Sequence, residues 1–160
     1  MEEMMVIKGP NNCLLPATDE DAETLKRYKL GQGITVRTTK VSANSLKFHQ
    51  RTIMLFRLCY DIFCERSDTG TVYKGEAVRP SFGTFRGEMT ILAGHYTPVY
   101  SMNGSFRREP KSISYAKCTD PEKEKLYSSV INAALKHIYG GSMPEEVLRN
   151  RIDQLMAFDQ

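Results

Sequence analysis

The stretch NSLKFHQRTIMLFRLCYDIFCER, residues 44–66, decides how the rest of the chain can fold. At about 100° per residue, its polar side chains fall within about 140° of one another and its large apolar side chains cover the opposite side. The polar set is Asn44, Lys47, Gln50, Arg51, Arg57, Asp61 and Glu65. The apolar set is Phe48, Leu55, Phe56, Cys59, Tyr60 and Phe63. The pattern predicts one amphipathic helix with a wide buried face and a narrow polar one.

Two basic residues, Lys47 and Arg51, stand four positions apart on the polar stripe near the start of this helix. The positive end of a helix dipole favours acidic side chains, so these two are poorly placed for helix stability. The same end of a helix is a good binding place for phosphate. We therefore predict that Lys47 and Arg51 are phosphate ligands, and the alternative is that they pair with acidic residues of another element. His49 falls on the apolar side and is interpreted as a partly buried, hydrogen-bonded histidine.

Length and composition indicate a single domain, residues 1–160, that can bury a sizeable core, since 41% of the residues are hydrophobic. No apolar run approaches the length of a membrane span, and the acidic N-terminus has no apolar signal-peptide segment. We therefore expect a cytoplasmic location and no membrane. The four cysteines match no zinc spacing and are expected to be reduced.

The net charge is only +3, but the charges are segregated along the chain. Residues 24–60 contain no Asp or Glu. Their basic residues are Lys26, Arg27, Lys29, Arg37, Lys40, Lys47, Arg51 and Arg57. Acidic residues collect instead in Asp19–Glu23, Asp120–Glu124 and Glu145–Asp153. This distribution predicts a phosphate-attracting surface, and the alternative is an ordinary solvated face.

The remaining pattern predicts an α+β fold, a small and mostly antiparallel sheet with four to five helices. Strands are expected over residues 4–8, 34–41 and 111–117. The second of these would carry Arg37 and Lys40.

Capping residues place the other helices. Thr18 can cap a first helix that stops at Gly31 or Gly33, and two capping boxes, at Thr119 and Ser142, begin two C-terminal helices. Residues 81–96 stay ambiguous, because Ser81 can cap a helix there but three glycines weaken it.

The Asn103-Gly104 pair between two β-capable runs is the strongest hairpin signal. A two-residue turn would place Tyr100 opposite Arg107. An aromatic ring beside an arginine suits stacking on an unpaired base, and the alternative is ordinary cross-strand packing. The predicted DNA-binding residues are Arg37, Lys40, Lys47, Arg51, Tyr100, Arg107, Arg108, Lys111 and Lys117.

Catalytic signatures are missing from the sequence. The acids occupy helix first turns and capping boxes, no carboxylate pair sits on a predicted strand as a Mg²⁺ site requires, and there is no phosphate-binding glycine loop. We therefore expect no enzyme, no catalytic residue, no metal and no cofactor, although a fold can assemble a site from distant residues.

Four blocks, SLKFHQRTIMLF, MTILAGHY, EPKSISYAK and LYSSVINAAL, resemble a phage and prophage protein family typified by YbcN. The resemblance covers most of the chain from residue 17 onward. That family is grouped with the NinB (Orf) recombination mediators of lambdoid phages, to which Ser45-Leu46, Gln50-Arg51 and Phe56 are similar at looser spacing.

The resemblance implies a homodimer that binds single-stranded DNA and the host single-strand-binding protein, assists recombinase loading and catalyses no reaction. If the chain is phage-encoded, its location is the cytoplasm of the host cell. The alternative is a phage interaction protein that binds and modulates a host protein through the same basic surface.

Overall fold

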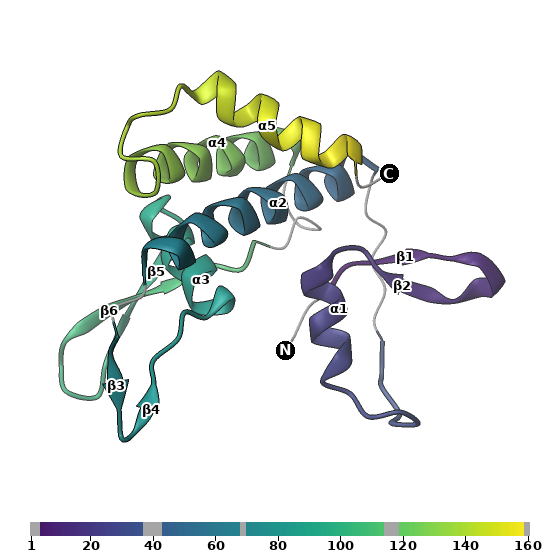
Figure 1. The fold of residues 1–160 in the computed structure, drawn as a ribbon. Coiled ribbons are helices and arrows are strands. Elements are labelled where there is room, and N and C mark those ends of the chain that lie inside the picture. The colour runs from purple at the N-terminus through teal and green to yellow at the C-terminus, as the bar shows by residue number, and fades with distance from the viewer. Residues whose placement is uncertain (1–3, 37–42, 68–69, 114–118, 159–160) are drawn as a thin grey trace.

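The computed structural model describes residues 4–36, 43–67, 70–113 and 119–158, and it confirms the α+β class. Its elements in chain order are β1 (Val6–Lys8), a 3₁₀ turn η1 (Pro10–Asn12), β2 (Leu14–Pro16), α1 (Asp19–Lys26), α2 (Ala43–Arg66), β3 (Val72–Tyr73), β4 (Glu76–Ala77), α3 (Phe82–Leu92), β5 (Tyr96–Tyr100), β6 (Phe106–Pro110), α4 (Asp120–His137) and α5 (Glu145–Phe158). Helices α2, α4 and α5 pack together, and α3 lies against α2 and α4. The β3–β4 and β5–β6 hairpins project from this helical body, and the β1–β2 hairpin lies to one side beside α1 (Figure 1).

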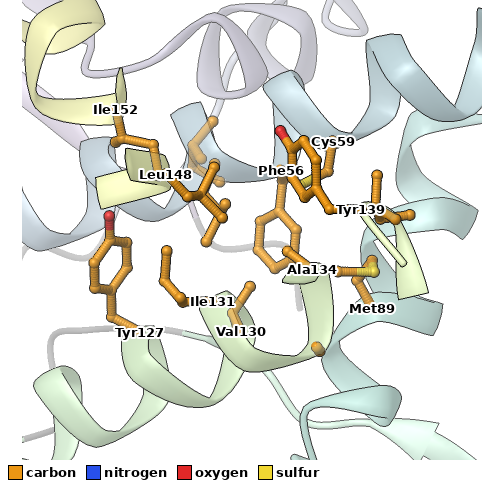
Figure 2. Close-up of a cluster of buried hydrophobic side chains, with 14 of the residues drawn as sticks. Phe56, Cys59, Met89, Tyr127, Val130, Ile131, Ala134, Tyr139, Leu148 and Ile152 are labelled. Atoms are coloured by element: carbon orange, nitrogen blue, oxygen red, sulfur yellow. The ribbon is translucent and has the colours of Figure 1, made fainter. Parts of the chain in front are cut away.

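The predicted amphipathic helix is confirmed as α2, and its apolar face forms one wall of the core. Phe56 and Cys59 on α2 are fully buried, as are Ile131 on α4 and Leu148 on α5 (Figure 2). Helix α3 adds Phe85 and Met89 to the same cluster. Four helices therefore share it, and α2 contacts each of the other three, which places α2 at the centre of the fold.

The two C-terminal helices are also confirmed, but the predicted capping box at Ser142 is wrong, because α5 begins at Glu145 and the Ser142 hydroxyl donates to the Tyr139 carbonyl at 2.6 Å. The predicted capping box at Thr119 is present, with the Glu122 Oε2 accepting from the Thr119 backbone N–H at 2.7 Å. Gly140 and Gly141 have φ values of 60° and 75°, a left-handed conformation that glycine adopts without strain. This turn brings α5 back along α4.

The ambiguous segment after residue 80 forms helix α3, capped by Ser81, whose Oγ accepts from the Thr84 N–H. A Cβ at Gly87 would lie 3.3 Å from the Pro110 side chain, so this glycine permits the close approach of α3 to β6. Packing between the two elements thus explains a glycine that counts against a helix in the sequence alone.

The strands form three separate two-stranded antiparallel sheets, β1–β2, β3–β4 and β5–β6, so the expectation of one sheet is corrected for the described residues. Residues 34–36 and 111–113 form no strand, and the rest of the predicted strands 34–41 and 111–117 lies outside the described residues. An alternating pattern becomes a strand only where a partner edge is available, and each hairpin here pairs only with itself.

The first helix ends at Lys26, before the predicted glycine stops. Beyond it, the Lys29 backbone N–H donates to the Gln32 side-chain oxygen at 2.9 Å, and the Gln32 N–H donates to the Lys29 carbonyl at 3.0 Å. These local bonds satisfy the backbone without a further helical turn.

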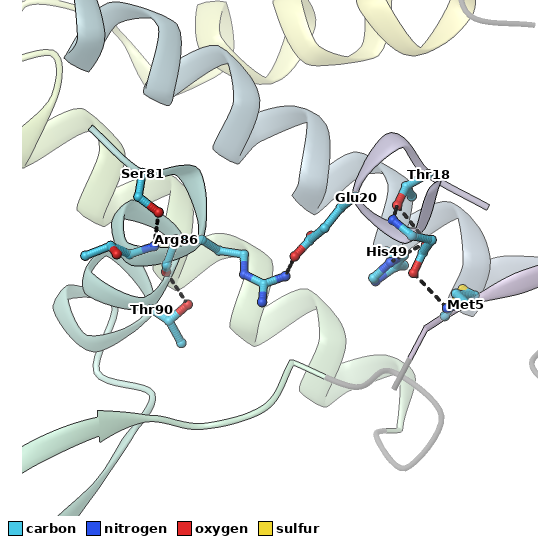
Figure 3. A network of polar contacts seen from close by, with 9 residues as sticks. Met5, Thr18, Glu20, His49, Ser81, Arg86 and Thr90 are labelled. Carbon is cyan, nitrogen blue, oxygen red and sulfur yellow. Dashed lines mark hydrogen bonds and ion pairs between the residues drawn. The ribbon is translucent and has the colours of Figure 1, made fainter. Parts of the chain in front are cut away.

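The N-terminal hairpin and α1 are attached to the helical body through Asp21, which is buried. Asp21 accepts from the Met5 N–H at 2.8 Å and from the Thr18 hydroxyl at 2.6 Å, and its Oδ2 lies 3.7 Å from His49 Nε2 (Figure 3). Burial alone would raise the pKa of Asp21, but the contacts with His49, Thr18 and Met5 outweigh it and hold this pKa below its ordinary value. His49 is thus largely buried, as predicted, and an Arg86–Glu20 ion pair ties α1 to α3.

Candidate nucleic-acid interface

The tip of the β5–β6 hairpin carries two exposed aromatic rings. Tyr100 is 87% exposed and Phe106 is 61% exposed, and the two residues are paired directly across the strands. Met102, in the turn, is fully exposed as well. Single exposed apolar side chains are ordinary, but a group of three at one hairpin tip makes this tip a candidate contact surface.

Arg108 lies on the same face as the aromatic pair. Side chains alternate along a strand, so the Pro98–Arg108 pair stands directly behind the Tyr100–Phe106 pair on that face. The Arg108 guanidinium lies 4.9 Å from the centre of the Tyr96 ring. A planar cation held behind two exposed rings can contact a phosphate while bases stack on the rings.

The turn differs from the prediction by one residue, so Tyr100 faces Phe106 and the predicted Tyr100–Arg107 pair is wrong. The loop has three residues, with Gly104 donating to the Ser101 carbonyl at 3.0 Å and adopting a φ of 79°. The Asn103 side chain accepts from the Ser105 N–H at 3.1 Å, which stabilises this longer loop.

Arg107 therefore lies on the opposite face from Tyr100. It is paired across the strands with Val99 and forms an ion pair with Glu109. Of the two adjacent arginines, only Arg108 shares a face with the exposed rings.

Lys111 is exposed at the base of the hairpin, where its backbone N–H donates to the His95 carbonyl at 3.1 Å. Burial, Lys111 and Lys125 on α4 together lower the pKa of His95. Sequence reasoning missed both His95 and Lys125. No local pattern could have found them, because tertiary packing, with α3 lying against both β6 and α4, places α4 near the end of β6.

The two predicted phosphate ligands on α2, Lys47 and Arg51, have different surroundings. Lys47 is exposed, whereas the Arg51 Nη2 lies 2.7 Å from Asp153 on α5 and its guanidinium lies 5.9 Å from the Tyr127 ring centre. Burial raises the pKa of Tyr127 to about 12, so the Tyr127 ring beside the Arg51 guanidinium is uncharged at neutral pH. Arg51 thus joins α2 to α4 and α5.

The predicted site residues Arg37, Lys40 and Lys117 lie outside the described residues.

We predict that Arg51→Ala lowers the free energy of unfolding by about 1 kcal/mol and leaves nucleic-acid affinity unchanged, because it removes a partly exposed ion pair and a cation–π contact. Chemical denaturation and an oligonucleotide titration measure the two effects. Lys47→Ala is the matched control. Among the described residues no ion pair joins Lys47 to a carboxylate, so its stability should change by less than about 0.5 kcal/mol. An Arg51→Ala protein of unchanged stability and reduced affinity would instead make Arg51 a ligand.

Within the part of the chain that the structure describes, no group of three or more His, Cys, Asp or Glu side chains is arranged to hold a metal ion. No helix there combines the length and apolar character needed to cross a membrane.

The described residues form an α+β fold from which the β5–β6 hairpin projects, and this hairpin carries exposed aromatic and basic side chains. The chain belongs to the family described as Protein of unknown function (DUF1367), whose model matches residues 65–158. The match includes α3, the β5–β6 hairpin, α4 and α5. No curated protein and no solved structure matches the chain.

Proposed function

We propose that this protein binds single-stranded DNA without sequence preference, with the β5–β6 hairpin as the principal contact surface. The observation that carries this proposal is the exposed Tyr100–Phe106 pair with Arg108 on the same face. Stacking of a base on an aromatic side chain contributes about 1–3 kcal/mol and tolerates any sequence, because every base has a π-face.

The charge of the hairpin supports the same ligand. Residues 96–111 carry three cations, Arg107, Arg108 and Lys111, against one carboxylate, Glu109. A basic surface of this kind attracts the phosphate backbone without reading its bases.

The resemblance to phage recombination proteins suggests a cellular role for this binding. On that basis we propose a homodimeric recombination mediator that assists recombinase loading together with the host single-strand-binding protein and has no catalytic activity. Location in the host cytoplasm belongs to the same proposal.

A salt titration tests the binding. We expect a fluorescently labelled oligonucleotide of about 15 nucleotides to bind at about 50 mM salt and to weaken steeply toward about 200 mM, with log K falling by about 0.7 per phosphate contact for each unit of log salt. The affinity should be similar for different base compositions and lower for a duplex. No binding at low salt, or a flat salt response, would overturn the proposal.

The alternative is that the same surface binds and modulates a host protein. The full exposure of Met102 beside Tyr100 and Phe106 favours it, because an apolar patch of this kind is also typical of protein interfaces. A complex with a host protein that persists at high salt, with no oligonucleotide binding at low salt, would select this function.

A further inference from the structure

The base of the β5–β6 hairpin brings together three basic residues from different parts of the chain. His95 precedes β5, Lys111 follows β6, and Lys125 lies in the second turn of α4. The hydrogen bond from Lys111 N–H to the His95 carbonyl, 3.1 Å long, holds the first two segments together. Helix α3 packs against both β6 and α4 and so positions the third residue beside them.

The charged side chains that act on His95 are all of one sign. Across the described residues, the charged groups that act on His95 are Lys111 and Lys125, both exposed. The carboxylates of the elements packed there are not among them: Glu88 on α3, Glu109 on β6, and Asp120, Glu122 and Glu124 on α4.

Six cations of the described chain form ion pairs with carboxylates, and others, such as Lys8 and Lys136, do not. The six pairs are Lys26 with Glu23, Arg51 with Asp153, Arg86 with Glu20, Arg107 with Glu109, Lys123 with Asp120, and Arg149 with Glu145. Neither Lys111 nor Lys125 forms an ion pair with a described carboxylate. Two lysines gathered around an imidazole without a counter-charge do not stabilise a fold, but they suit a bound anion.

We propose that His95, Lys111 and Lys125 form a phosphate-binding subsite that holds the backbone of the same strand whose bases stack on Tyr100 and Phe106. This inference rests on the proposed function and names a second contact of that surface. The subsite and the aromatic pair lie at opposite ends of the hairpin, about 17 Å apart for the five residues from His95 to Tyr100 at about 3.4 Å per residue. One bound strand can span this distance, since single-strand sites cover about 4–16 nucleotides.

The subsite should couple binding to proton uptake at His95. In the free protein, burial and the two lysines disfavour the imidazolium. A bound phosphate favours it and raises the pKa of His95, so the complex takes up a proton. The affinity should therefore increase as the pH falls from about 8 toward about 6, the range around the ordinary histidine pKa. This increase should shrink in His95→Gln and persist in His137→Gln, a control at an exposed histidine on α4.

The decisive experiment compares Lys111→Ala/Lys125→Ala with Lys8→Ala/Lys136→Ala, which removes two exposed lysines from β1 and from the end of α4. With the labelled oligonucleotide, the first variant should reduce the slope of log K against log salt by about 1.4, the value for two lost single-strand phosphate contacts. The control should change the slope much less, and thermal melts should show both variants folded. Equal slopes for the two variants would overturn the subsite and leave the proposed function standing.

A second arm uses inorganic phosphate and follows the His95 resonance by NMR as the pH is varied. If the wild type binds no oligonucleotide but phosphate raises the pKa of His95, the subsite stands as a site for free phosphate and the proposed function fails. If neither ligand has an effect, both are overturned.

Discussion

Replacement of Tyr100 and Phe106 together by alanine should lower the affinity for single-stranded DNA by about 30-fold or more, since each stacked base is worth about 1–3 kcal/mol. Both rings are exposed on one face of the hairpin and neither belongs to the core cluster. The fold should therefore lose little, about 0.2–1 kcal/mol for the cross-strand pair. Anisotropy titrations and thermal melts on the same samples measure both quantities.

The chain offers a matched control for this variant. Tyr73 is also exposed, at 67%, on the β3–β4 hairpin, where the Lys74 ammonium lies 5.4 Å from its ring centre. Tyr73→Ala removes a similar ring from a different hairpin and should leave the affinity nearly unchanged. If Tyr73→Ala lowers the affinity as much as the double variant, the strand does not depend on the β5–β6 tip in particular.

Phe56→Ala should lower the free energy of unfolding by about 3–5 kcal/mol, because it removes a large ring from a fully enclosed site and leaves a cavity. Phe56 is 0% exposed and points from α2 into the cluster shared with α4 and α5 (Figure 2). Native domains are stable by only about 5–15 kcal/mol, so this loss is a large share of the total. For a chain of this size it corresponds to a fall in the melting temperature of roughly 6–20 °C.

Phe106→Ala is the control for this prediction, since the chemical change is identical and only the surroundings differ. At its exposed position the stability should change by about 0.5 kcal/mol or less, while the DNA affinity falls. Similar destabilisation by both variants would mean that the hairpin tip is part of the folding core.

The location of Phe56 also bears on the family match, which begins at residue 65, near the end of α2. The buried side chains of α2, among them Leu55, Phe56 and Cys59, are supplied by residues before that point. The matched region contains α4 and α5 but lacks most of the helix against which they pack. We infer that α2 is a required part of the folded unit.

Much of the local structure could be predicted from the sequence. The period of apolar residues identified α2, the capping box at Thr119 identified α4, and Asn103-Gly104 identified the β5–β6 hairpin. Each of these signals acts within one or two turns of the chain, where nearby residues decide the backbone conformation.

The hairpin register shows where such local reasoning stops. The Asn103 side chain and the left-handed Gly104 form a three-residue loop in place of the predicted two-residue turn. One extra residue moves Arg107 to the opposite face, because side chains alternate along a strand. The predicted partner of Tyr100 was therefore wrong, although the presence of the hairpin was confirmed.

The sequence by itself determined the α+β class, three of the helices that form the core (α2, α4 and α5), and the presence of aromatic and basic residues near one turn. Only the tertiary structure decided which cations meet carboxylates and which do not. The sequence pattern predicts that Arg51 binds phosphate, but in the folded protein α5 places Asp153 within 2.7 Å of it. Lys125 looks like an ordinary solvated residue of a helix, yet the packing of α3 on α4 and β6 brings it near His95 and Lys111. The physical reason is that electrostatic interactions depend on distance through space, which separation along the sequence does not reveal until the helices have packed.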